Sequence, residues 1–398
     1  MKHSLSPTQA DRPGDAGLPR YSGELLPGPP RRRTRRHRGL LVMLAVLVLV
    51  LGATAGSVVP ALTAPGTQSN TARLAEWARN HGLGAVVTWL EQLTYQQPKV
   101  GGTPKGNSPL HHAQASSPPS SRAAEKLPAA IPPPATPALP GEGSWRVVAR
   151  VHGRPAMAEA FLRPDAVHTS YTVGAVWFNP HLVAARLHPG AAQPGGSGWT
   201  TPPSIAHPSG LLAAFNSGFK LTDAHGGFYA DGRYAKSLVP GAASMVFRRD
   251  GSMTVGRWGR DVRMGPSVAA VRQNLVLLVD HGRVVPGIDT NTTRSWGATI
   301  GNKKYVWRSG IGVTAQGNLI DVIGPRLSAH SLADLLHRAG CVRAMELDIN
   351  PEWTSFVRYP ASATSPTRKP VNLLSTMHRS PRRYNTTSAR DFVTLHAR

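Results

Sequence analysis

The chain has 398 residues, 40% of them hydrophobic, and a formal net charge of +24. Such an excess of Lys and Arg over Asp and Glu favours polyanionic partners, whether nucleic acid, anionic lipid or a phosphate-bearing polymer. The single cysteine, Cys341, excludes an intramolecular disulfide framework and a zinc site built from several cysteines. Because Cys341 lies in an apolar run, we expect it to be a buried small hydrophobe.

A basic segment and then an apolar one stand near the N-terminus. Residues 1–38 are rich in Pro and Gly, end in "RRRTRRHR", and predict a disordered basic cytoplasmic tail. Residues 39–59 carry no charge and are long enough to span a bilayer as a helix, although "ATA" at 53–55 also resembles a signal-peptide cleavage site. By the positive-inside rule we expect a single-pass cell-membrane protein with an extracytoplasmic C-terminal part. For such an exported domain we expect no nucleic-acid partner.

Composition divides the rest of the chain into three segments. Residues 60–97 place apolar side chains near helical spacing and predict a stalk with an amphipathic helix. Residues 98–143 are rich in Pro, Ala and Ser, which predicts a semi-rigid linker without a core. From Trp145 onwards the composition is again typical of a folded domain, so we place that domain at 144–398.

Strand-like runs dominate this domain. Three runs contain a turn between two apolar halves and predict β-hairpins, with turns at 250–251, 281–282 and 316–318. The stretch "SAHSLADLLHRAG" at 328–340 predicts the clearest helix, capped by a serine and ended by Gly340. These elements predict an α+β fold with a mixed, largely antiparallel sheet and a few helices, preceded by a single transmembrane helix and a Pro-rich linker.

Two carboxylates lie two residues apart in "CVRAMELDINPEW", residues 341–353. In a strand, Glu346 and Asp348 project from one face. Carboxylates this close do not both ionise readily unless a cation intervenes, so one pKa should rise. The alternatives are a solvent-facing edge strand, or an acid that caps a turn.

Two other stretches are candidates for a site. A glycine-rich loop at 213–241 carries Asn216, Gly218, Lys220 and Asp231, and glycines of this density let backbone amides approach a ligand closely. An ordinary turn-rich loop is the alternative.

The second of these stretches is "YVWRSGIG", where Arg308 ends a short aromatic-flanked strand ahead of Ser309. The planar fork of arginine suits a bidentate grip on phosphate or carboxylate. A generic surface arginine is the alternative.

The order of these stretches resembles the phosphodiester glycosidase domain family. That family has an "NGGFF"-like segment, an "R-T-x-x-G" segment, a Leu-rich helix ending in Gly, and a closing "LDGGGS". The corresponding stretches here are "FNSGF", "RSGIG", "SLADLLHRAGCVRA" and "ELDINPEW", within about residues 205–356.

Carried over by position, the family's polar site residues fall on Asn216, Gly218, Arg308 and Asp348. The departures are Ser217 for one glycine, Ser309 for threonine, and 349–352 for "GGGS". Without those glycines, the backbone can no longer come as close to a bound sugar or phosphate as the resemblance would require.

The resemblance implies hydrolysis of a sugar 1-phosphodiester at its glycosidic carbon. Arg308, helped by Lys220, would hold the phosphate. Asp348 would activate water or stabilise the oxocarbenium-like carbon, with Glu346 or Glu352 as the second carboxylate. Asn216 would orient a sugar hydroxyl, and Gly218, Asp231 and Ser309 would line the substrate.

We expect no cofactor and no resident metal. The alternative is a hard cation such as calcium, held by Asp223, Asp231 and Asp348, although no EF-hand-like spacing is present. The expected partners are a phosphate-bearing glycan or cell-wall polymer and, through the N-terminal helix, the membrane. The rival function is a non-catalytic surface module that binds anionic wall or capsule polymers.

Overall fold

The computed structural model describes most of the chain beyond the predicted tail. The described residues are 43–44, 52, 54–64, 68–106, 108–112, 127–206, 209–290, 293–297, 299, 303–360 and 369–398. The chain divides into two units, Met1–Ser57 and Val58–Arg398. None of the helices described is both long and apolar enough to cross a bilayer, and most of the predicted anchor 39–59 lies outside the described residues.

Helices precede the sheets in the second unit. Residues 60–97, predicted as a stalk with an amphipathic helix, contain two helices, α2 (Asn70–Asn80) and α3 (Gly84–Thr94). Gly82 separates them with φ +79°, a conformation that side-chain-bearing residues rarely adopt. A short helix, α4 (Pro109–His112), follows.

Part of the predicted linker packs onto the domain. Ile131 is buried in the core beside the large sheet. Glu142 forms a buried ion pair with Arg163, with 2.7 Å between Oε2 and Nη2. Residues 127–143 are therefore attached to the domain by both apolar and ionic contacts.

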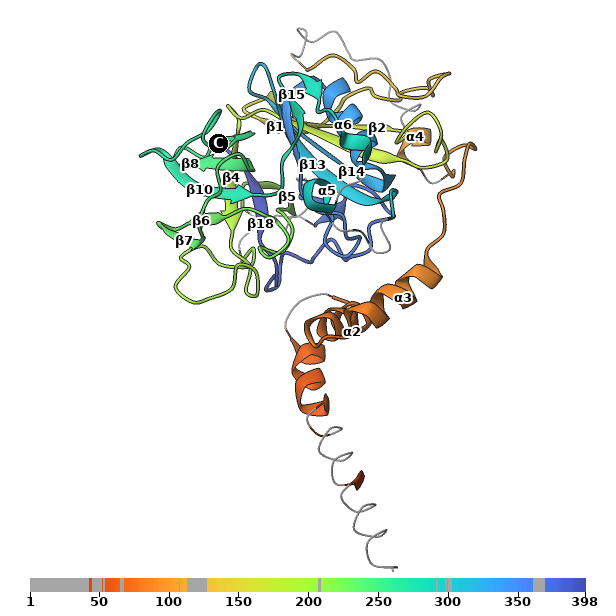
Figure 1. Ribbon diagram of the computed structural model, residues 1–398. Coiled ribbons are helices and arrows are strands. Elements are labelled where there is room, and N and C mark those ends of the chain that lie inside the picture. The colour runs from red at the N-terminus through yellow and green to blue at the C-terminus, as the bar shows by residue number, and fades with distance from the viewer. Residues whose placement is uncertain are drawn as a thin grey trace, which may run out of the picture. The chain divides into compact units, whose positions relative to one another are not determined.

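The largest sheet has eight strands in the described part, all paired antiparallel, in the order β1-β2-β3-β14-β13-β15-β11-β12. Its strands are β1 (Arg146–Val151), β2 (Arg154–Leu162), β3 (Val173–Phe178), β11 (Leu277–Asp280), β12 (Arg283–Val284), β13 (Val306–Thr314), β14 (Leu319–Leu327) and β15 (Cys341–Glu346). Helix α6 (Ala329–Arg338) covers one face of this sheet and packs against β13, β14 and β15 (Figure 1). Leu332, Leu335 and Leu336 provide its buried face.

Two five-stranded antiparallel sheets complete the domain. One has the order β7-β6-β10-β8-β9, with strands β6 (Phe228–Ala230), β7 (Arg233–Lys236), β8 (Ala243–Arg248), β9 (Met253–Arg257) and β10 (Val268–Gln273). The other has the order β17-β16-β5-β18-β4, with strands β4 (Val183–His188), β5 (Leu211–Asn216), β16 (Phe356–Arg358), β17 (Val371–Asn372) and β18 (Phe392–Ala397). Two short helices, η2 (Ile288–Thr290) and α5 (Thr293–Trp296), lie between β12 and β13. The main apolar core gathers side chains from all three sheets.

The sequence predictions for this domain are largely confirmed. The three predicted hairpins are β8–β9, β11–β12 and β13–β14. The predicted helix is α6, where Ser328 and Ser331 form a capping box. The fold consists mostly of antiparallel sheets with a few helices, as expected.

A buried carboxyl group in the large sheet leads to a stability prediction. Asp321 pairs across the sheet with Ile311 and Val176, and its Oδ1 accepts no hydrogen bond from any described residue. Burial raises the pKa of this carboxyl well above its usual value. The folded chain therefore holds a proton that the unfolded chain loses at lower pH, so stability is lost as pH rises towards the folded pKa.

We expect Asp321→Asn to raise the melting temperature at neutral pH. The gain in the free energy of unfolding of this variant over wild type should be absent near pH 4. It should grow by about 1.4 kcal/mol per pH unit until the pH reaches the pKa of Asp321 in the folded chain. Thermal denaturation at several pH values measures this. Asp250→Asn is the control of opposite sign, because hydrogen bonds from Ser252 lower the pKa of the exposed Asp250. A melting temperature that is equal in Asp321→Asn and wild type at every pH contradicts the prediction.

Candidate active site

Segments from two of the three sheets meet around Asp348. Asn216 ends β5, Ser309 lies in β13, and Asp348 follows β15 by two residues. Asn216 Nδ2 donates to Ser309 Oγ at 3.0 Å, and the Ser309 amide donates to the carbonyl of Asp348 at 2.9 Å. Three residues predicted from separate motifs are thus joined by direct hydrogen bonds.

The Asp348 carboxylate is buried and fixed at both oxygens. Its Oδ1 accepts from the amides of Ile349 (2.8 Å) and Asn350 (2.9 Å), while Oδ2 accepts from Arg390 Nη2 at 3.1 Å. Burial raises the pKa of Asp348, although Arg390 and the two amides act in the opposite direction. The carboxylate is therefore oriented and is more basic than an ordinary aspartate.

Glu346 forms the second acidic group, paired with Arg308. The distance between Arg308 Nη1 and Glu346 Oε1 is 2.5 Å, and both side chains are inaccessible to solvent. Arg308 also donates from Nε to the carbonyl of Leu327 (3.0 Å) and from Nη1 to that of Trp296 (3.3 Å). Burial raises the pKa of Glu346, Arg308 opposes the rise, and the charge of Asp348 adds to it. Glu346 Oε2 and Arg308 Nη2 have no hydrogen-bond partner among the described residues.

Three arginines from the C-terminal segment surround Trp353. The guanidinium carbons of Arg379, Arg383 and Arg390 lie 5.3, 5.6 and 4.7 Å from its ring centroid. Burial lowers the pKa of Arg383, and burial with the neighbouring Arg383 charge lowers that of Arg379 to about 9. Arg383 is 3% exposed and, among the described residues, donates only to the carbonyls of Glu352 and Trp353. No described carboxylate lies at salt-bridge distance from Arg383, so a buried positive charge stands beside the acids.

A second buried ion pair supports the glycine segment. Arg272 pairs with Asp391 at 2.6 Å and also donates to the carbonyl of Phe219. A Cβ added at Gly218 would lie 3.0 Å from the Arg272 guanidinium carbon, and the Gly218 carbonyl accepts from Arg390 at 3.1 Å. A side chain at 218 would therefore displace Arg272.

Asn274 connects this segment to the acidic strand. Its Oδ1 accepts from the amide of Phe219 at 3.2 Å. Its Nδ2 donates to the carbonyls of Glu346 (2.9 Å) and Leu347 (3.0 Å). Asn274 thereby fixes the spacing between the glycine segment and the carboxylates.

Two other predicted substrate-binding residues, Lys220 and Asp231, make contacts elsewhere. Lys220 forms an ion pair with Glu76 at 2.8 Å. Asp231 accepts from the amides of Thr200 and Thr201 and from the Thr201 hydroxyl, so it orders that loop. Glu352 is half-buried, and the side chain of His378 lowers its pKa.

In the described part of the chain, no group of three or more His, Cys, Asp or Glu side chains could hold a metal ion. The alternative calcium set of Asp223, Asp231 and Asp348 is thus not brought together there.

Arg390, Arg383, Arg272, Asn274 and Asp391 were not predicted from the sequence. The stretch "SARDFVTLHA" contains the available signal, because polar Arg390 and Asp391 directly precede an apolar run. That run is β18, which pairs with both β5 and β4. The basic C-terminal segment therefore contributes to the site rather than only covering the sheet.

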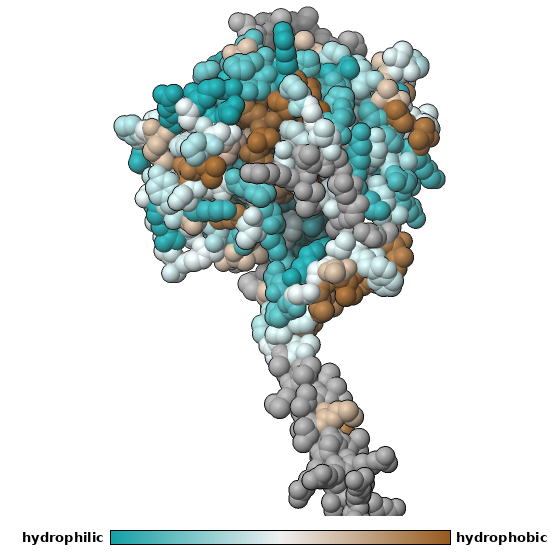
Figure 2. Space-filling model, in the orientation of Figure 1, coloured by the Kyte–Doolittle hydropathy of each residue, from teal (hydrophilic) through white to brown (hydrophobic). Residues whose placement is uncertain are grey.

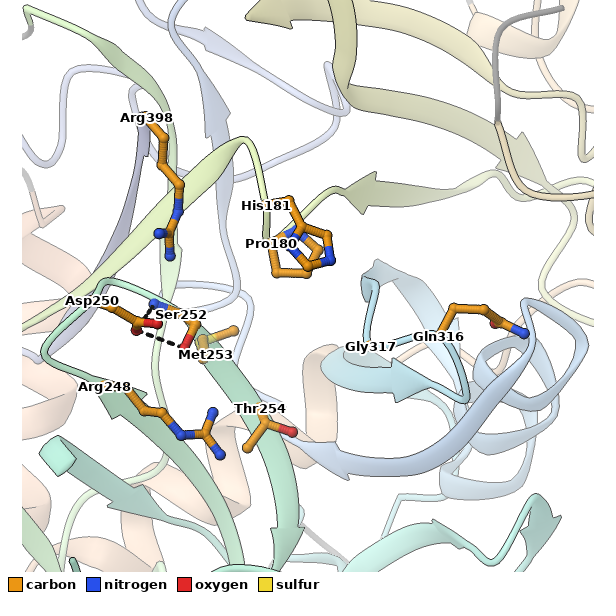
Figure 3. A pocket seen from close by; sticks show the side chains of 10 residues that line it. All are labelled: Pro180, His181, Arg248, Asp250, Ser252, Met253, Thr254, Gln316, Gly317 and Arg398. Atoms are coloured by element: carbon orange, nitrogen blue, oxygen red, sulfur yellow. Dashed lines mark hydrogen bonds between the residues drawn. The ribbon is translucent and has the colours of Figure 1, made fainter. Parts of the chain in front are cut away.

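Two surface cavities are lined by other residues. One of about 440 Å³ lies at the turns of β8–β9 and β13–β14, and Figure 3 shows Arg248 and Arg398 on either side of Asp250 and Ser252. The other, of about 390 Å³, adjoins β7. The face shown in Figure 2 is largely hydrophilic over the sheets, with apolar residues in separate patches. A polar ligand fits such a surface better than an apolar one.

Residues 209–348 match the family model described as phosphodiester glycosidase. This part of the chain, about a third of its length, is similar to that domain family. The matched region contains Asn216, Ser309, Glu346 and Asp348, and the arginines at 379, 383 and 390 lie beyond its end. The arginines near Asp348 thus come from outside the matched region.

Solved structures offer more distant similarities. The catalytic domain of zebrafish N-acetylglucosamine-1-phosphodiester alpha-N-acetylglucosaminidase, auto-inhibited by its pro-peptide, is 17% identical with a TM-score of 0.40, over 64% of this chain and 88% of that one. A hypothetical protein from Synechocystis is 15% identical with a TM-score of 0.37, over 63% and 64%. No curated protein matches the sequence. Similarities at this distance assign no role to individual residues.

Proposed function

We propose that this protein hydrolyses the glycosidic bond of a sugar 1-phosphodiester in an extracytoplasmic glycan. The observation that carries the proposal is the oriented Asp348 carboxylate beside Arg390 and the buried Arg383 guanidinium, which forms no salt bridge with a described carboxylate. A buried guanidinium without a carboxylate partner is costly, and a bound phosphate would relieve that cost. The family match over 209–348 supports the same reaction class.

The proposed mechanism uses the two acids and the arginines in separate roles. Arg390 and Arg383 bind the phosphate and stabilise its charge as the bond between the sugar C1 and the phosphate oxygen breaks. Water attacks C1, Asp348 accepts the proton from that water, and the phosphomonoester leaves with the electron pair. Asn216 and Gly218 shape the sugar side.

The second acid would then have a supporting role. Glu346 stabilises the positive charge that develops at the sugar. Arg308 holds Glu346 in place, which agrees with its complete burial better than a direct grip on phosphate.

One observation favours the rival function of binding without hydrolysis. The amides of Ile349 and Asn350 both donate to Asp348, so they are not free to contact a ligand. Ile349 also packs beside Phe219, Ala224 and Leu275. The positions of the family's glycines are therefore occupied by intramolecular contacts.

We further propose that residues 39–59 anchor the protein in the cell membrane, with residues 1–38 in the cytoplasm. The run of arginines before an uncharged segment supports this orientation. The domain would then act on phosphate-bearing polymer at the outer face.

The test incubates the full chain with the methyl diester of a hexose 1-phosphate and with phosphate-rich wall polymer. Release of reducing sugar together with phosphomonoester, in equal amounts, would support hydrolysis at the glycosidic carbon. Retention of polymer without release of either product would overturn it in favour of the binding module.

The role of Arg390 leads to a prediction for pH dependence. Arg390 opposes the burial-driven rise of the Asp348 pKa, so its removal should raise that pKa further. Because activity requires the carboxylate, we expect the acid limb of kcat/KM in Arg390→Gln to move to higher pH, in addition to a lower maximum. The exposed neighbour Arg382→Gln is the control and should retain the wild-type limb. If the acid limb of kcat/KM in Arg390→Gln stays at the wild-type pH, the group that titrates on that limb is not Asp348.

A further inference from the structure

The cavity of about 390 Å³ lies between a glycine-rich loop and strand β7. It is lined by Pro194, Gly195, Gly196, Ser197, Trp199, Arg233, Tyr234 and Ala235. Its volume falls in the range of small-ligand sites in proteins. None of these residues belongs to the site around Asp348.

Gln193 and Lys236 adjoin the two walls of this cavity in sequence, and both are hydrogen-bonded to segments that precede Arg390 or follow Gly218. Next to the loop wall, the amide of Gln193 donates to the carbonyl of Ala389 (2.8 Å), and Gln193 Oε1 accepts from the amide of Leu221 (3.1 Å). Next to the other wall, Lys236 Nζ donates to the carbonyl of Leu221 (2.6 Å). Ala389 precedes Arg390, and Leu221 follows Gly218 by three residues. The cavity therefore adjoins the two segments that position the Arg390 guanidinium.

Arg233 gives this cavity a fixed positive charge. Its guanidinium carbon lies 3.7 Å from the centroid of the Trp199 ring. A Cβ at Gly198 would lie 3.2 Å from Arg233 Nη1, so the absence of a side chain there leaves room for the guanidinium. Among the described residues, no carboxylate pairs with Arg233, and its buried Nε has no hydrogen-bond partner. A guanidinium held on an indole face and left without an anion is prepared to bind one.

Tyr234 adds an aromatic surface beside this charge. It is 56% exposed, and its ring centroid lies 4.8 Å from that of Tyr229. An exposed ring supported from one side can pack on the apolar face of a sugar, because it presents a large contact area at a low entropic cost. A cation and an aromatic surface together match a phosphorylated sugar.

We propose that this cavity binds the second sugar phosphate of a substrate in which hexoses are joined by phosphodiesters. Arg233 binds the additional phosphate and Tyr234 packs on the adjoining sugar, on the leaving-group side of the scissile bond. The inference rests on the proposed hydrolysis at Asp348 and extends it to a polymer of repeating sugar phosphates.

The test compares two synthetic substrates. One is the methyl diester of a hexose 1-phosphate, and the other is a trimer of the same hexose joined through phosphodiesters. We expect wild type to prefer the trimer in kcat/KM, and Arg233→Gln and Tyr234→Ala to reduce that preference about tenfold, as expected for one charge-assisted contact. The control is Arg248→Gln, which removes an arginine from the cavity in Figure 3 and should retain the preference.

The outcomes separate the subsite from the reaction. An unchanged preference in Arg233→Gln overturns the subsite, as does an equal loss in Arg248→Gln, which would indicate only net charge. If wild type cleaves neither substrate, hydrolysis is refuted and calorimetric titration with the trimer decides the subsite. In that case, weaker binding of the trimer by Arg233→Gln than by wild type and Arg248→Gln supports the subsite. Equal binding of the trimer by all three proteins overturns the subsite.

Discussion

Asp348→Asn is expected to reduce kcat on a sugar 1-phosphodiester by about 10³-fold or more, the scale seen when a residue of the catalytic machinery is removed. The amide keeps an oxygen that can accept from Ile349 and Asn350, so the turn after β15 is preserved. It cannot take a proton from water. Initial-rate measurement of released phosphomonoester, at matched melting temperature, gives the result.

The matched control is Asp223→Asn. Asp223 is exposed, and its carboxylate accepts from the neighbouring Thr222 hydroxyl. We expect wild-type turnover from this variant. Residual activity in Asp348→Asn within tenfold of wild type would transfer the catalytic role to another group, with Glu346 as the nearest acid.

The second large effect concerns the buried pair of Arg308 and Glu346. Arg308→Met leaves Glu346 buried without its cation, which should cost about 3–5 kcal/mol in the free energy of unfolding. The double variant Arg308→Met/Glu346→Leu removes both charges and should recover most of that loss. Urea unfolding of the two variants and wild type measures the difference.

A partly exposed pair provides the comparison for this prediction. Arg338 and Asp334 are one helical turn apart in α6, with side chains 33% and 31% exposed. Arg338→Met should cost no more than about 0.5 kcal/mol. If Arg308→Met is equally mild, the pair does not stabilise the fold, and Arg308 becomes available for direct contact with phosphate.

Local patterns in the sequence predicted the elements that depend on neighbouring residues. The turns at 250–251, 281–282 and 316–318 and the capped helix α6 are specified within a few positions each. The approach of Asn216, Ser309 and Asp348 followed from motif order, through the family resemblance. Short-range chemistry was sufficient for these features.

The positions of Arg390 and Arg272 in the site depend on pairing between strands that are far apart in the sequence. Local sequence patterns do not reveal such pairing. Arg390 reaches Asp348 because β18 is inserted between β5 and β4, with Phe392 opposite both Asn216 and His188. Arg272 meets Asp391 across 119 positions of sequence. Neither register is encoded near the residues concerned, and the burial of Arg308 likewise depends on how Trp296 and Leu327 enclose it.

The central position of β18 has a consequence for biosynthesis. A chain made from its N-terminus reaches Arg390 and β18 only after the other described strands have emerged, and β5 and β4 must wait for the strand that joins them. A nascent or prematurely ended polypeptide would contain Asp348 without its arginine partner. The site around Asp348 would thus be complete only once β18 has been made and has paired with β5 and β4.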